Sequence, residues 1–278
     1  MKVLLTGIGG FIGSHLAKAW QDAALDFVGV SRRKLSDNNE FQLIYCDLAN
    51  GVPYEKSVDI IVHAAAKSPS PDARIEDFVS SNVEGTRKLL EYAVKHGVSK
   101  FIYLSSVSVY GTVQVPIVDE ETAVVDPGIY GMTKLIGELL VKEAGLKSSI
   151  ALRLPGVLGP GAKTPWLCKV LDNLKNNMPV EYFNPYSPFN NLLHVDDLDM
   201  FIRHLFSYEW EGFNVVTLAS KRSMPVRHLL EGLKRKTGSL SELIELNDNR
   251  KSFQISTKKA VSIGFNPICS DNFLDELI

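Results

Sequence analysis

The sequence has little of what marks secreted, membrane-bound or nucleic-acid-binding proteins. Its 278 residues contain only three cysteines, Cys46, Cys168 and Cys269, which lie far apart with neither metal-site nor CxxC spacing. We therefore expect reduced thiols in a cytoplasmic protein. A net charge of −2 gives no basis for binding nucleic acid or an acidic membrane. No apolar run is long enough to span a membrane, and the chain enters an apolar strand at Val3, so we expect no signal peptide.

The chain opens with the pattern of a strand, a glycine-rich turn and a helix. Val3 to Leu5 is a short apolar run, typical of a strand that is buried on both faces of a parallel sheet. The helical pattern that follows the turn is apolar on one side. The glycines of the turn are Gly7, Gly10 and Gly13, and the apolar side of the helix carries Phe11, Ile12, Leu16, Ala19 and Trp20.

This context predicts that the turn and the first helical residues, Phe11 and Ile12, bind the pyrophosphate of a dinucleotide. Gly7 allows a tight turn, Gly10 has no Cβ to keep a pyrophosphate from the backbone, and Gly13 lets the helix pack close to the strand. The helix N-terminus offers free N–H groups and the positive end of its dipole. Three glycines alone would be a weak signal, but their place between a buried strand and a helix favours nucleotide binding over an ordinary turn.

Short apolar runs alternate with helical patterns along most of the chain. The expected strands are 27–30, 41–45, 59–63, 100–104, 149–154 and 213–218, and the expected helices are 75–96, 128–144, 166–174, 195–206 and a surface helix at 226–236. Gly97 should end the first of these helices, and the glycines from Gly156 to Gly161 should form a loop. This alternation predicts an α/β fold with a doubly wound, Rossmann-like parallel sheet and a smaller C-terminal substrate-binding lobe.

The length allows one large domain and a smaller lobe. We expect a dinucleotide-binding domain at 1–160 together with 191–218, and the substrate-binding lobe at 161–190 and 219–278. Ligands of such a sheet bind at the carboxyl ends of its strands.

The expected second strand ends in Ser31, Arg32 and Arg33, at the place where a dinucleotide fold contacts the adenosine ribose. An acidic residue here would bind a 2′-hydroxyl, whereas arginine suits a 2′-phosphate. The arginines could also be merely solvated. Because no carboxylate stands at this position, we expect NADP as the cofactor, with NAD as the alternative. After the fourth strand, the small side chains of Ala64 and Ala65 would let the backbone lie close to a ligand.

Tyr130 and Lys134 lie four residues apart in an expected helix and therefore share one face of it. A free tyrosine has a pKa of about 10, and a nearby ammonium favours the phenolate, so the pair could shuttle a proton near neutral pH. Ser106, at the carboxyl end of the fifth strand, could hydrogen-bond the substrate oxygen. Alone, such residues are usually a surface pair and a turn serine. Together with the glycine turn and the parallel sheet, they favour a catalytic interpretation.

Motifs along nearly the whole chain carry a family resemblance. They are TGIGGFIG from Thr6, CDL at Asp47, HAAA from His63, NVEGTRKLLEYA from Asn82, YLSSVSVYG from Tyr103, YGMTK from Tyr130, LGPG from Leu158, HVDDL from His194 and STKKAVSIGFNP from Ser256. With these motifs the chain resembles the extended short-chain dehydrogenase/reductases, which include nucleotide-sugar epimerases, ketoreductases and dehydratases. The resemblance implies a catalytic Ser106, Tyr130 and Lys134, with hydride passing between a substrate carbon and nicotinamide.

The same resemblance implies further contacts. Asp47 would contact the adenine, and the next residue, Leu48, would also belong to the cofactor site. Pro155 would lie near the nicotinamide amide. Asn82 would stand on the helix that supports the active site. Because the helices near 75–96 and 128–144 form the dimer interface in many relatives, we expect a homodimer.

Departures from the family pattern narrow the expected reaction. Sugar-nucleotide dehydratases carry an Asp-Glu pair where this chain has Val107 and Ser108, so dehydration is not expected. The 3,5-epimerizing reductases use a cysteine where this chain has Ser108, which argues against double epimerization. What remains is redox at one carbinol of a nucleotide sugar, either 4-keto reduction or 4-epimerization, in which the hydride returns to the other face.

The expected substrate site also departs from the pattern. Many relatives have Asn where this chain has Gly156 and Arg where it has Asn190. We expect Gly156, Asn190 and Asn191 to contact the substrate; Lys163 and Trp166 could join them, although Trp166 could equally be core.

Two other functions stay open. These two departures leave room for an NADP-dependent reductase of a small carbonyl or a steroid-like alcohol. An NADP-binding, redox-sensing module without catalysis is the non-enzymatic alternative. Relatives of that kind typically lose the catalytic Tyr or Lys, and both are present here.

Overall fold

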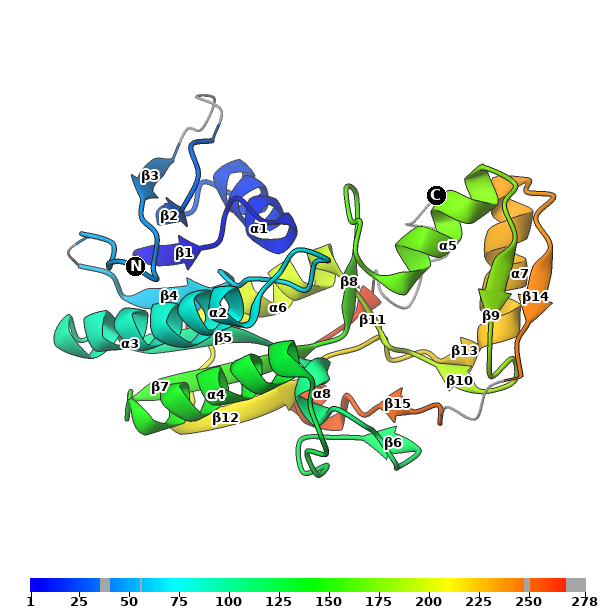
Figure 1. The fold of residues 1–278 in the computed structure, drawn as a ribbon. Helices are drawn as coiled ribbons and strands as arrows, with labels where there is room; N and C mark the ends of the chain where they lie inside the picture. The colour runs from blue at the N-terminus through cyan, green and yellow to red at the C-terminus, as the bar shows by residue number, and fades with distance from the viewer. Residues whose placement is uncertain (36–40, 56, 248–250, 269–278) are drawn as a thin grey trace. The chain divides into compact units, whose positions relative to one another are not determined.

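The computed structural model describes residues 1–35, 41–55, 57–247 and 251–268 (Figure 1), so the expected thiol at Cys269 lies outside the described residues. The chain forms two compact units. The first contains 1–112, 124–153 and 202–216, and the second contains 113–123, 154–201 and 217–278. These boundaries differ from the expected domains, because 113–123, 154–160, 191–201 and 217–218 belong to the second unit.

A seven-stranded sheet forms the centre of the first unit, in the order β12-β7-β5-β4-β1-β2-β3. Strands β1, β2, β4 and β5 pair in parallel with one another along this order, and β3 pairs in parallel with β2. The predicted doubly wound parallel sheet is thus confirmed. The strands are β1 (Val3–Thr6), β2 (Phe27–Ser31), β3 (Gln42–Tyr45), β4 (Ile60–His63), β5 (Lys100–Ser106), β7 (Ser148–Leu154) and β12 (Gly212–Thr217).

The direction of winding changes at β1. The chain runs from β1 outward to β2 and β3, and then returns to place β4 on the other side of β1. In open parallel sheets the crevice outside the carboxyl ends of the strands at such a switch point is the place where ligands bind. All four residues of β1 are buried, which explains why its sequence is a continuous apolar run.

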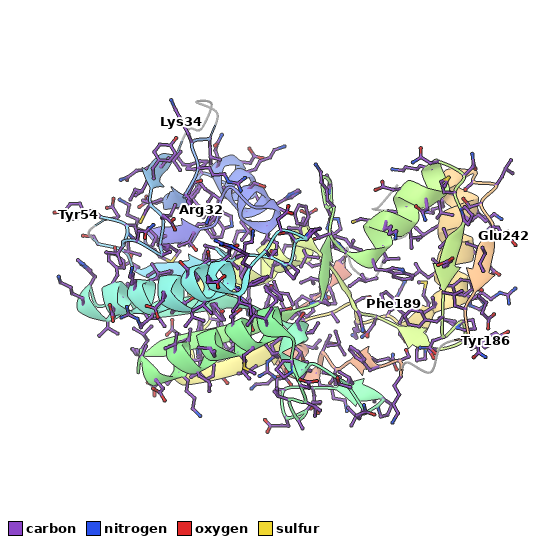
Figure 2. All side chains as sticks on the ribbon, viewed as in Figure 1. Arg32, Lys34, Tyr54, Tyr186, Phe189 and Glu242 are labelled. Carbon is purple, nitrogen blue, oxygen red and sulfur yellow. The ribbon has the colours of Figure 1, made fainter. Side chains whose placement is uncertain are left out.

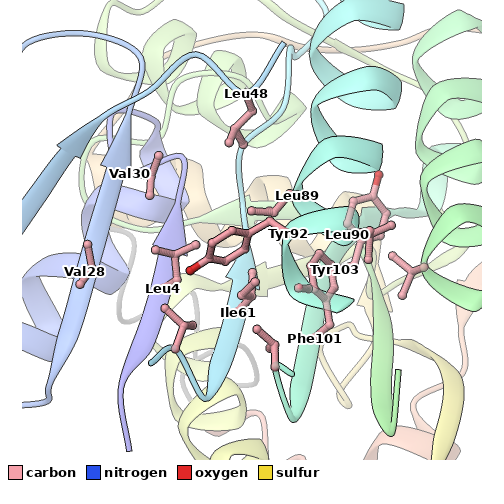
Figure 3. Close-up of a cluster of buried hydrophobic side chains, with 14 of the residues drawn as sticks. Leu4, Val28, Val30, Leu48, Ile61, Leu89, Leu90, Tyr92, Phe101 and Tyr103 are labelled. Atoms are coloured by element: carbon pink, nitrogen blue, oxygen red, sulfur yellow. The ribbon is translucent and has the colours of Figure 1, made fainter. Parts of the chain in front are cut away.

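Helices cover both faces of this sheet. Helices α3 (Gly85–Lys95) and α4 (Ile129–Glu143) lie side by side along one face (Figure 1). On the other face, Trp20 of α1 (Phe11–Asp22) packs edge-on against Phe206 of α6 (Val195–Ser207), with 5.4 Å between ring centroids. Buried side chains of β1, β2, β4, β5 and α3 form the core between the sheet and α3 (Figure 3), among them Leu4, Val28, Ile61, Leu89 and Phe101.

The helix expected at 75–96 is interrupted. It consists of α2 (Ile75–Phe78), a π-helical turn (Val79–Glu84) and α3, and it ends before Gly97, whose φ of +65° ends it as predicted. A π turn adds a residue to the helical repeat and often marks a functional site. Here it holds the buried side chain of Asn82, an amide that an apolar-periodicity argument does not detect.

The second unit contains short strand pairs. The pairs are β8 (Gly156–Leu158) with β11 (Leu192–His194), β9 (Val180–Tyr182) with β14 (Leu243–Glu245), β10 (Pro188–Phe189) with β13 (Met224–Pro225), and β6 (Ile117–Val118) with β15 (Gln254–Ile255). The prediction that a loop starts at Gly156 is therefore wrong for its first residues, because Gly156 belongs to β8 and pairs with Leu192.

The second unit has a core of its own. Helices α5 (Trp166–Lys175) and α7 (Val226–Thr237) pack together through apolar side chains, including Leu171 and Leu229. The expected surface helix at 226–236 thus has one buried face. A short helix, α8 (Lys258–Ser262), follows β15. Over the described part of the chain, no helix combines the length and the apolar character needed to cross a membrane.

The glycine turn gives a first testable prediction. A Cβ on Gly13 would lie 2.2 Å from the carbonyl oxygen of Gly7, and backbone cannot yield at that distance as a flexible side chain can. Gly13→Ala should lower the free energy of unfolding by about 1–3 kcal/mol, the usual cost of overpacking. Gly51→Ala is the matched control, because its Cβ meets nothing within 4 Å. Equal denaturant midpoints for the two variants would contradict the packing described here.

Candidate active site

The structure brings Ser106, Tyr130 and Lys134 together within the first unit. Ser106 is the last residue of β5, and Tyr130 and Lys134 stand in the first turns of α4, which packs against β5. The Tyr130 phenol is hydrogen-bonded to Ser106. The Ser106 hydroxyl also donates to Oγ of Ser108 and accepts the N–H of Ser108, each over 3.1 Å. A serine and a phenol joined in this way can hold one substrate oxygen between them.

The lysine does not act on the phenol as the sequence suggested. Burial raises the pKa of Tyr130 above its ordinary value, and the hydrogen bond with Ser106 opposes that rise. Lys134 lies over a different ring, with 4.1 Å from its Nζ to the centroid of Tyr103. In this structure the group that favours the Tyr130 phenolate is therefore Ser106, whereas the Lys134 ammonium rests on an aromatic face.

Lys134 itself is almost fully buried. Burial lowers its pKa from the ordinary 10.5 to about 7, and the carboxylate of Glu138 opposes that fall. An amine with such a pKa can be charged or neutral near physiological pH, which suits a group that must respond to proton movement beside it.

A buried chain of hydrogen bonds runs from the first strand to the active-site helix. Thr86 donates its hydroxyl to the carbonyl of Asn82 over 2.7 Å, so its oxygen must accept from Nε2–H of His63, 2.9 Å away. Nδ1 of His63 then accepts from the Thr6 hydroxyl over 2.7 Å. The network thus assigns a neutral, Nε2-protonated imidazole. Burial, with the nearby Lys134 charge as a lesser cause, lowers the pKa of His63 to about 3.

Asn82 continues this chain to α4. Its amide nitrogen donates to Oγ1 of Thr133 over 3.1 Å, and Thr133 donates to the carbonyl of Tyr130 over 2.9 Å. Asn82 also accepts the N–H of Lys67 over 2.7 Å and donates to the Lys67 carbonyl over 3.2 Å. Sequence analysis predicted that Asn82 lies near the site but assigned no role to His63. A lone histidine at the end of a strand carries no local sequence pattern that shows its hydrogen-bond partners.

The glycine turn fits the phosphates of a dinucleotide. Gly7 adopts a φ of +78°, and a Cβ there would lie 2.6 Å from the backbone nitrogen of Ala65, so this segment closes against the turn. A Cβ on Gly10 would meet only the Gly7 carbonyl oxygen, at 3.3 Å. Gly10 precedes α1, whose first turn carries no acidic side chain. Phe11 and Ile12 begin this helix and are half-buried. The helix N-terminus can therefore receive an anion.

The segment after β2 is basic. Ser31 is buried, donates its hydroxyl to the carbonyl of Arg33 over 2.8 Å and accepts the N–H of Arg33 over 3.1 Å. Arg32, Arg33 and Lys34 are exposed, and Figure 2 labels Arg32 and Lys34 on this segment.

After β3, Asp47 accepts the N–H of Ala49 and the side-chain amide of Asn50, each over 3.2 Å, so its carboxylate holds the local turn. Leu48 is buried in the core between the sheet and α3. Pro155, the expected neighbour of the nicotinamide amide, belongs to the second unit.

In the second unit, the buried Asn190 side chain is hydrogen-bonded to two other segments of the same unit. Its amide donates to the carbonyls of Ser220 and Ile255 over 2.9 and 2.8 Å and accepts the N–H of Ile255 over 2.9 Å. Asn191 differs, because its Oδ1 is buried and has no hydrogen-bond partner among the described residues. An acceptor in that state is available to a donor from a ligand.

Two other expected contacts lie in the same unit. A Cβ on Gly156 would lie 3.2 Å from Cβ of Pro165, so an asparagine at this position would require Pro165 to move. Trp166 is partly exposed and packs edge-on against Phe189, which Figure 2 labels, with 5.8 Å between ring centroids. It is therefore not a core residue, and Lys163 nearby in the sequence is exposed.

Comparison with known proteins shows the family of the chain. The model of the NAD dependent epimerase/dehydratase family matches residues 3–209. The chain belongs to this family. The predicted resemblance to extended short-chain dehydrogenase/reductases is thereby confirmed. Among solved structures, MoeE5 in complex with UDP-glucuronic acid and NAD has a TM-score of 0.84 and 26% identity, over 99% of this chain and 97% of that one.

Two curated relatives show the range of the family. A UDP-glucose 4-epimerase of Azospirillum brasilense is 27% identical over 179 residues, which is 59% of this chain and 51% of the relative. A D-erythronate dehydrogenase of Cupriavidus necator is 30% identical over 179 residues, which is 56% of this chain and 55% of the relative. The matches thus span about half the length of these two relatives.

The buried imidazole predicts a pH dependence of stability. The pKa of His63 is about 3 in the folded protein and near 6.5 when unfolded, so between these values the unfolded chain binds more protons. Stability should be full above pH 6.5 and fall below it, by about 2 kcal/mol between pH 8 and pH 5 from this residue. His63→Gln keeps a donor and an acceptor but cannot titrate. Denaturant unfolding of both proteins at the two pH values should show a smaller loss for the variant; equal losses would contradict the assignment.

Proposed function

We propose that the protein is a nicotinamide-dependent 4-epimerase of a nucleotide sugar. The observation that carries this proposal is the placement of Ser106, Tyr130 and Lys134 in the same compact unit as the glycine turn and the N-terminus of α1. The names of the relatives support it, since they include a UDP-glucose 4-epimerase and a protein bound to UDP-glucuronic acid and NAD.

The residues of this chain divide the work between binding and proton transfer. A dinucleotide, when bound, supplies the hydride acceptor. Ser106 donates a hydrogen bond to the C4 oxygen, and Tyr130, in its phenolate form, takes the proton of that hydroxyl as the carbinol is oxidised. Tyr130 returns the proton when the ketone is reduced from its other face. Lys134, whose ammonium lies over the ring of Tyr103, is the group that would hold ribose hydroxyls.

Dehydration has no support at this site. The turn after Ser106 is a 3₁₀ helix (Val107–Tyr110), and its polar side chain nearest to Ser106 is the hydroxyl of Ser108. A hydroxyl with an ordinary pKa cannot move protons as a carboxyl pair does. We therefore propose oxidation and reduction at one carbon, and net 4-keto reduction would use the same residues.

The choice of cofactor is a finer part of the proposal. The exposed Arg32 and Arg33 after β2 favour a 2′-phosphate, and hence NADP, over an unmodified ribose. The solved relative holds NAD, so the preference of this chain is a matter for direct measurement.

We further propose a homodimer. Helices α3 and α4 are neighbours and expose the large apolar side chains Val94, Met132 and Leu139. Such side chains are typical of a helical face that a second copy covers.

A second function has one specific support. The match to a D-erythronate dehydrogenase shows that the family includes a protein named for a small sugar acid. Gly156 has no side chain and the Asn190 amide is bonded within its own unit, so neither offers a free side chain to a diphosphate. A dehydrogenase of a small hydroxy acid would use Ser106, Tyr130 and Lys134 in the same way.

Tyr130→Phe tests the proton-transfer role. Turnover of UDP-glucose or UDP-glucuronic acid, with NAD or NADP present, should fall by about a hundredfold or more, the scale of a lost general acid or base. Cofactor binding and the melting temperature should stay close to wild type. Tyr54→Phe is the control, because Tyr54 is 82% exposed. Turnover by Tyr130→Phe at the rate of this control would remove Tyr130 from the mechanism.

Arg32→Ala combined with Arg33→Ala tests the cofactor preference. The double variant should bind NADPH at least about tenfold more weakly, because a charge-assisted contact with phosphate contributes more than about 1.4 kcal/mol. Binding of NADH should change little. Lys18→Ala combined with Lys147→Ala removes the same charge from exposed positions elsewhere in the same unit. Equal losses of NADPH and NADH affinity in the arginine variant would overturn the preference for NADP.

A further inference from the structure

A buried ionic cluster lies one helical turn beyond Lys134. Glu138 of α4, Arg153 of β7 and Ser105 of β5 are all buried, and they belong to the same unit as the proposed catalytic residues. The Glu138 carboxylate accepts Nε of Arg153 over 3.0 Å and Nη2 of Arg153 over 2.7 Å. It also accepts the hydroxyl of Ser105 over 2.5 Å. The Arg153 guanidinium lies over the ring of Tyr110, with 4.8 Å to its centroid.

We propose that Glu138 is a positioning residue, whose buried carboxylate holds Lys134 in its charged form and ties the end of β5 to α4. The importance of this role for catalysis rests on the proposed function, but the effect of Glu138 on the protonation of Lys134 does not depend on it. Glu138 follows Lys134 by four residues, so the two side chains lie on the same face of α4. Ser105 precedes Ser106, so the hydrogen bond from Ser105 to Glu138 fixes the strand beside the serine of the site.

The groups around Lys134 explain why this carboxylate matters. From β4 it faces the neutral His63, and from β5 it faces the ring of Tyr103. Tyr130 on α4 is a phenol, and Thr86 and Asn82 on the helix packed beside α4 are uncharged. Glu138 supplies the negative charge that opposes the desolvation of Lys134. Buried charges interact strongly because little water screens them.

Arg153 determines how strongly the Glu138 carboxylate stabilises the charged form of Lys134. Its guanidinium pairs with both carboxylate oxygens, and the ring of Tyr110 holds it in place. A carboxylate already paired with one cation stabilises a second cation less. Loss of the carboxylate and loss of the guanidinium should therefore move the titration of Lys134 in opposite directions, although both changes break the same ion pair.

The experiment follows the side-chain nitrogen of Lys134 directly. Protein with ¹⁵N at the lysine Nζ atoms is titrated by NMR, and the Lys134 signal is assigned by its absence in Lys134→Met. In wild type this signal should titrate near pH 7, well apart from exposed lysines near 10.4. Glu138→Gln should lower the midpoint by at least about half a unit, and Arg153→Gln should raise it by a similar amount. Ser105→Ala breaks a neutral contact with Glu138 and should leave the midpoint unchanged.

Charge-conserving variants keep the test decisive if a glutamine variant does not fold. Glu138→Asp and Arg153→Lys retain each charge, so the Lys134 midpoint should stay within about half a unit of wild type. Shifts in the same direction for the two glutamine variants, or larger shifts for the conservative pair, would overturn the proposal and leave the cluster purely structural.

The pH profile of kcat/KM with the nucleotide sugar separates this proposal from the proposed function. If Lys134 acts as its ammonium, the alkaline limb of the profile should follow the NMR midpoint down in Glu138→Gln and up in Arg153→Gln. Opposite NMR shifts in a protein without epimerase activity would uphold the role of Glu138 and reject the proposed reaction. Epimerase activity with an alkaline limb that moves in the same direction in both variants would uphold the proposed reaction and reject the role of Glu138.

Discussion

The hydrogen-bond chain from Thr6 to Tyr130 is the constraint on which the rest of the first unit depends. It begins on β1, directly before the glycine turn, and it reaches α4 through His63, Thr86 and the amide of Asn82. Every member is buried or half-buried, so each bond must be made or a polar group is left without a partner in a low-dielectric interior. The chain of hydrogen bonds therefore fixes β1 and α4 relative to each other within the same unit.

Burial also sets the chemistry of the site. It raises the pKa of Tyr130, lowers that of Lys134 and keeps His63 neutral, each by penalising the charged form. Against this background a few specific contacts decide the outcome. The hydrogen bond with Ser106 favours the Tyr130 phenolate, and the Glu138 carboxylate favours the Lys134 ammonium. The proton affinities of the Tyr130 phenol and the Lys134 amine therefore depend on two neighbours, Ser106 and Glu138, each of which a single substitution can remove.

The sequence predicts those parts of the structure that depend on local patterns of residues. The apolar run at Val3, the spacing of the three glycines and the pair Tyr130 and Lys134 predicted the sheet, the turn and the residues that the fold brings together. Tertiary contacts decided the rest. The amide of Asn82 in the π turn binds Lys67 and Thr133, which lie 15 and 51 residues away in the sequence. The bonds of Asn190 to Ser220 and Ile255 join residues that are far apart in the sequence, so no local pattern shows them. The same is true of the position of Lys134 over Tyr103.

The central claim is that hydride leaves C4 of a nucleotide sugar and returns to the opposite face while Tyr130 carries the proton. Incubation of the protein with NAD or NADP and UDP-glucose carrying deuterium at C4 tests this claim most directly. The account predicts a product that is inverted at C4 and still carries the deuterium there, as read by NMR. Inversion with loss of the deuterium to water would contradict hydride return, and neither inversion nor reduced nicotinamide across nucleotide sugars would contradict the assignment itself.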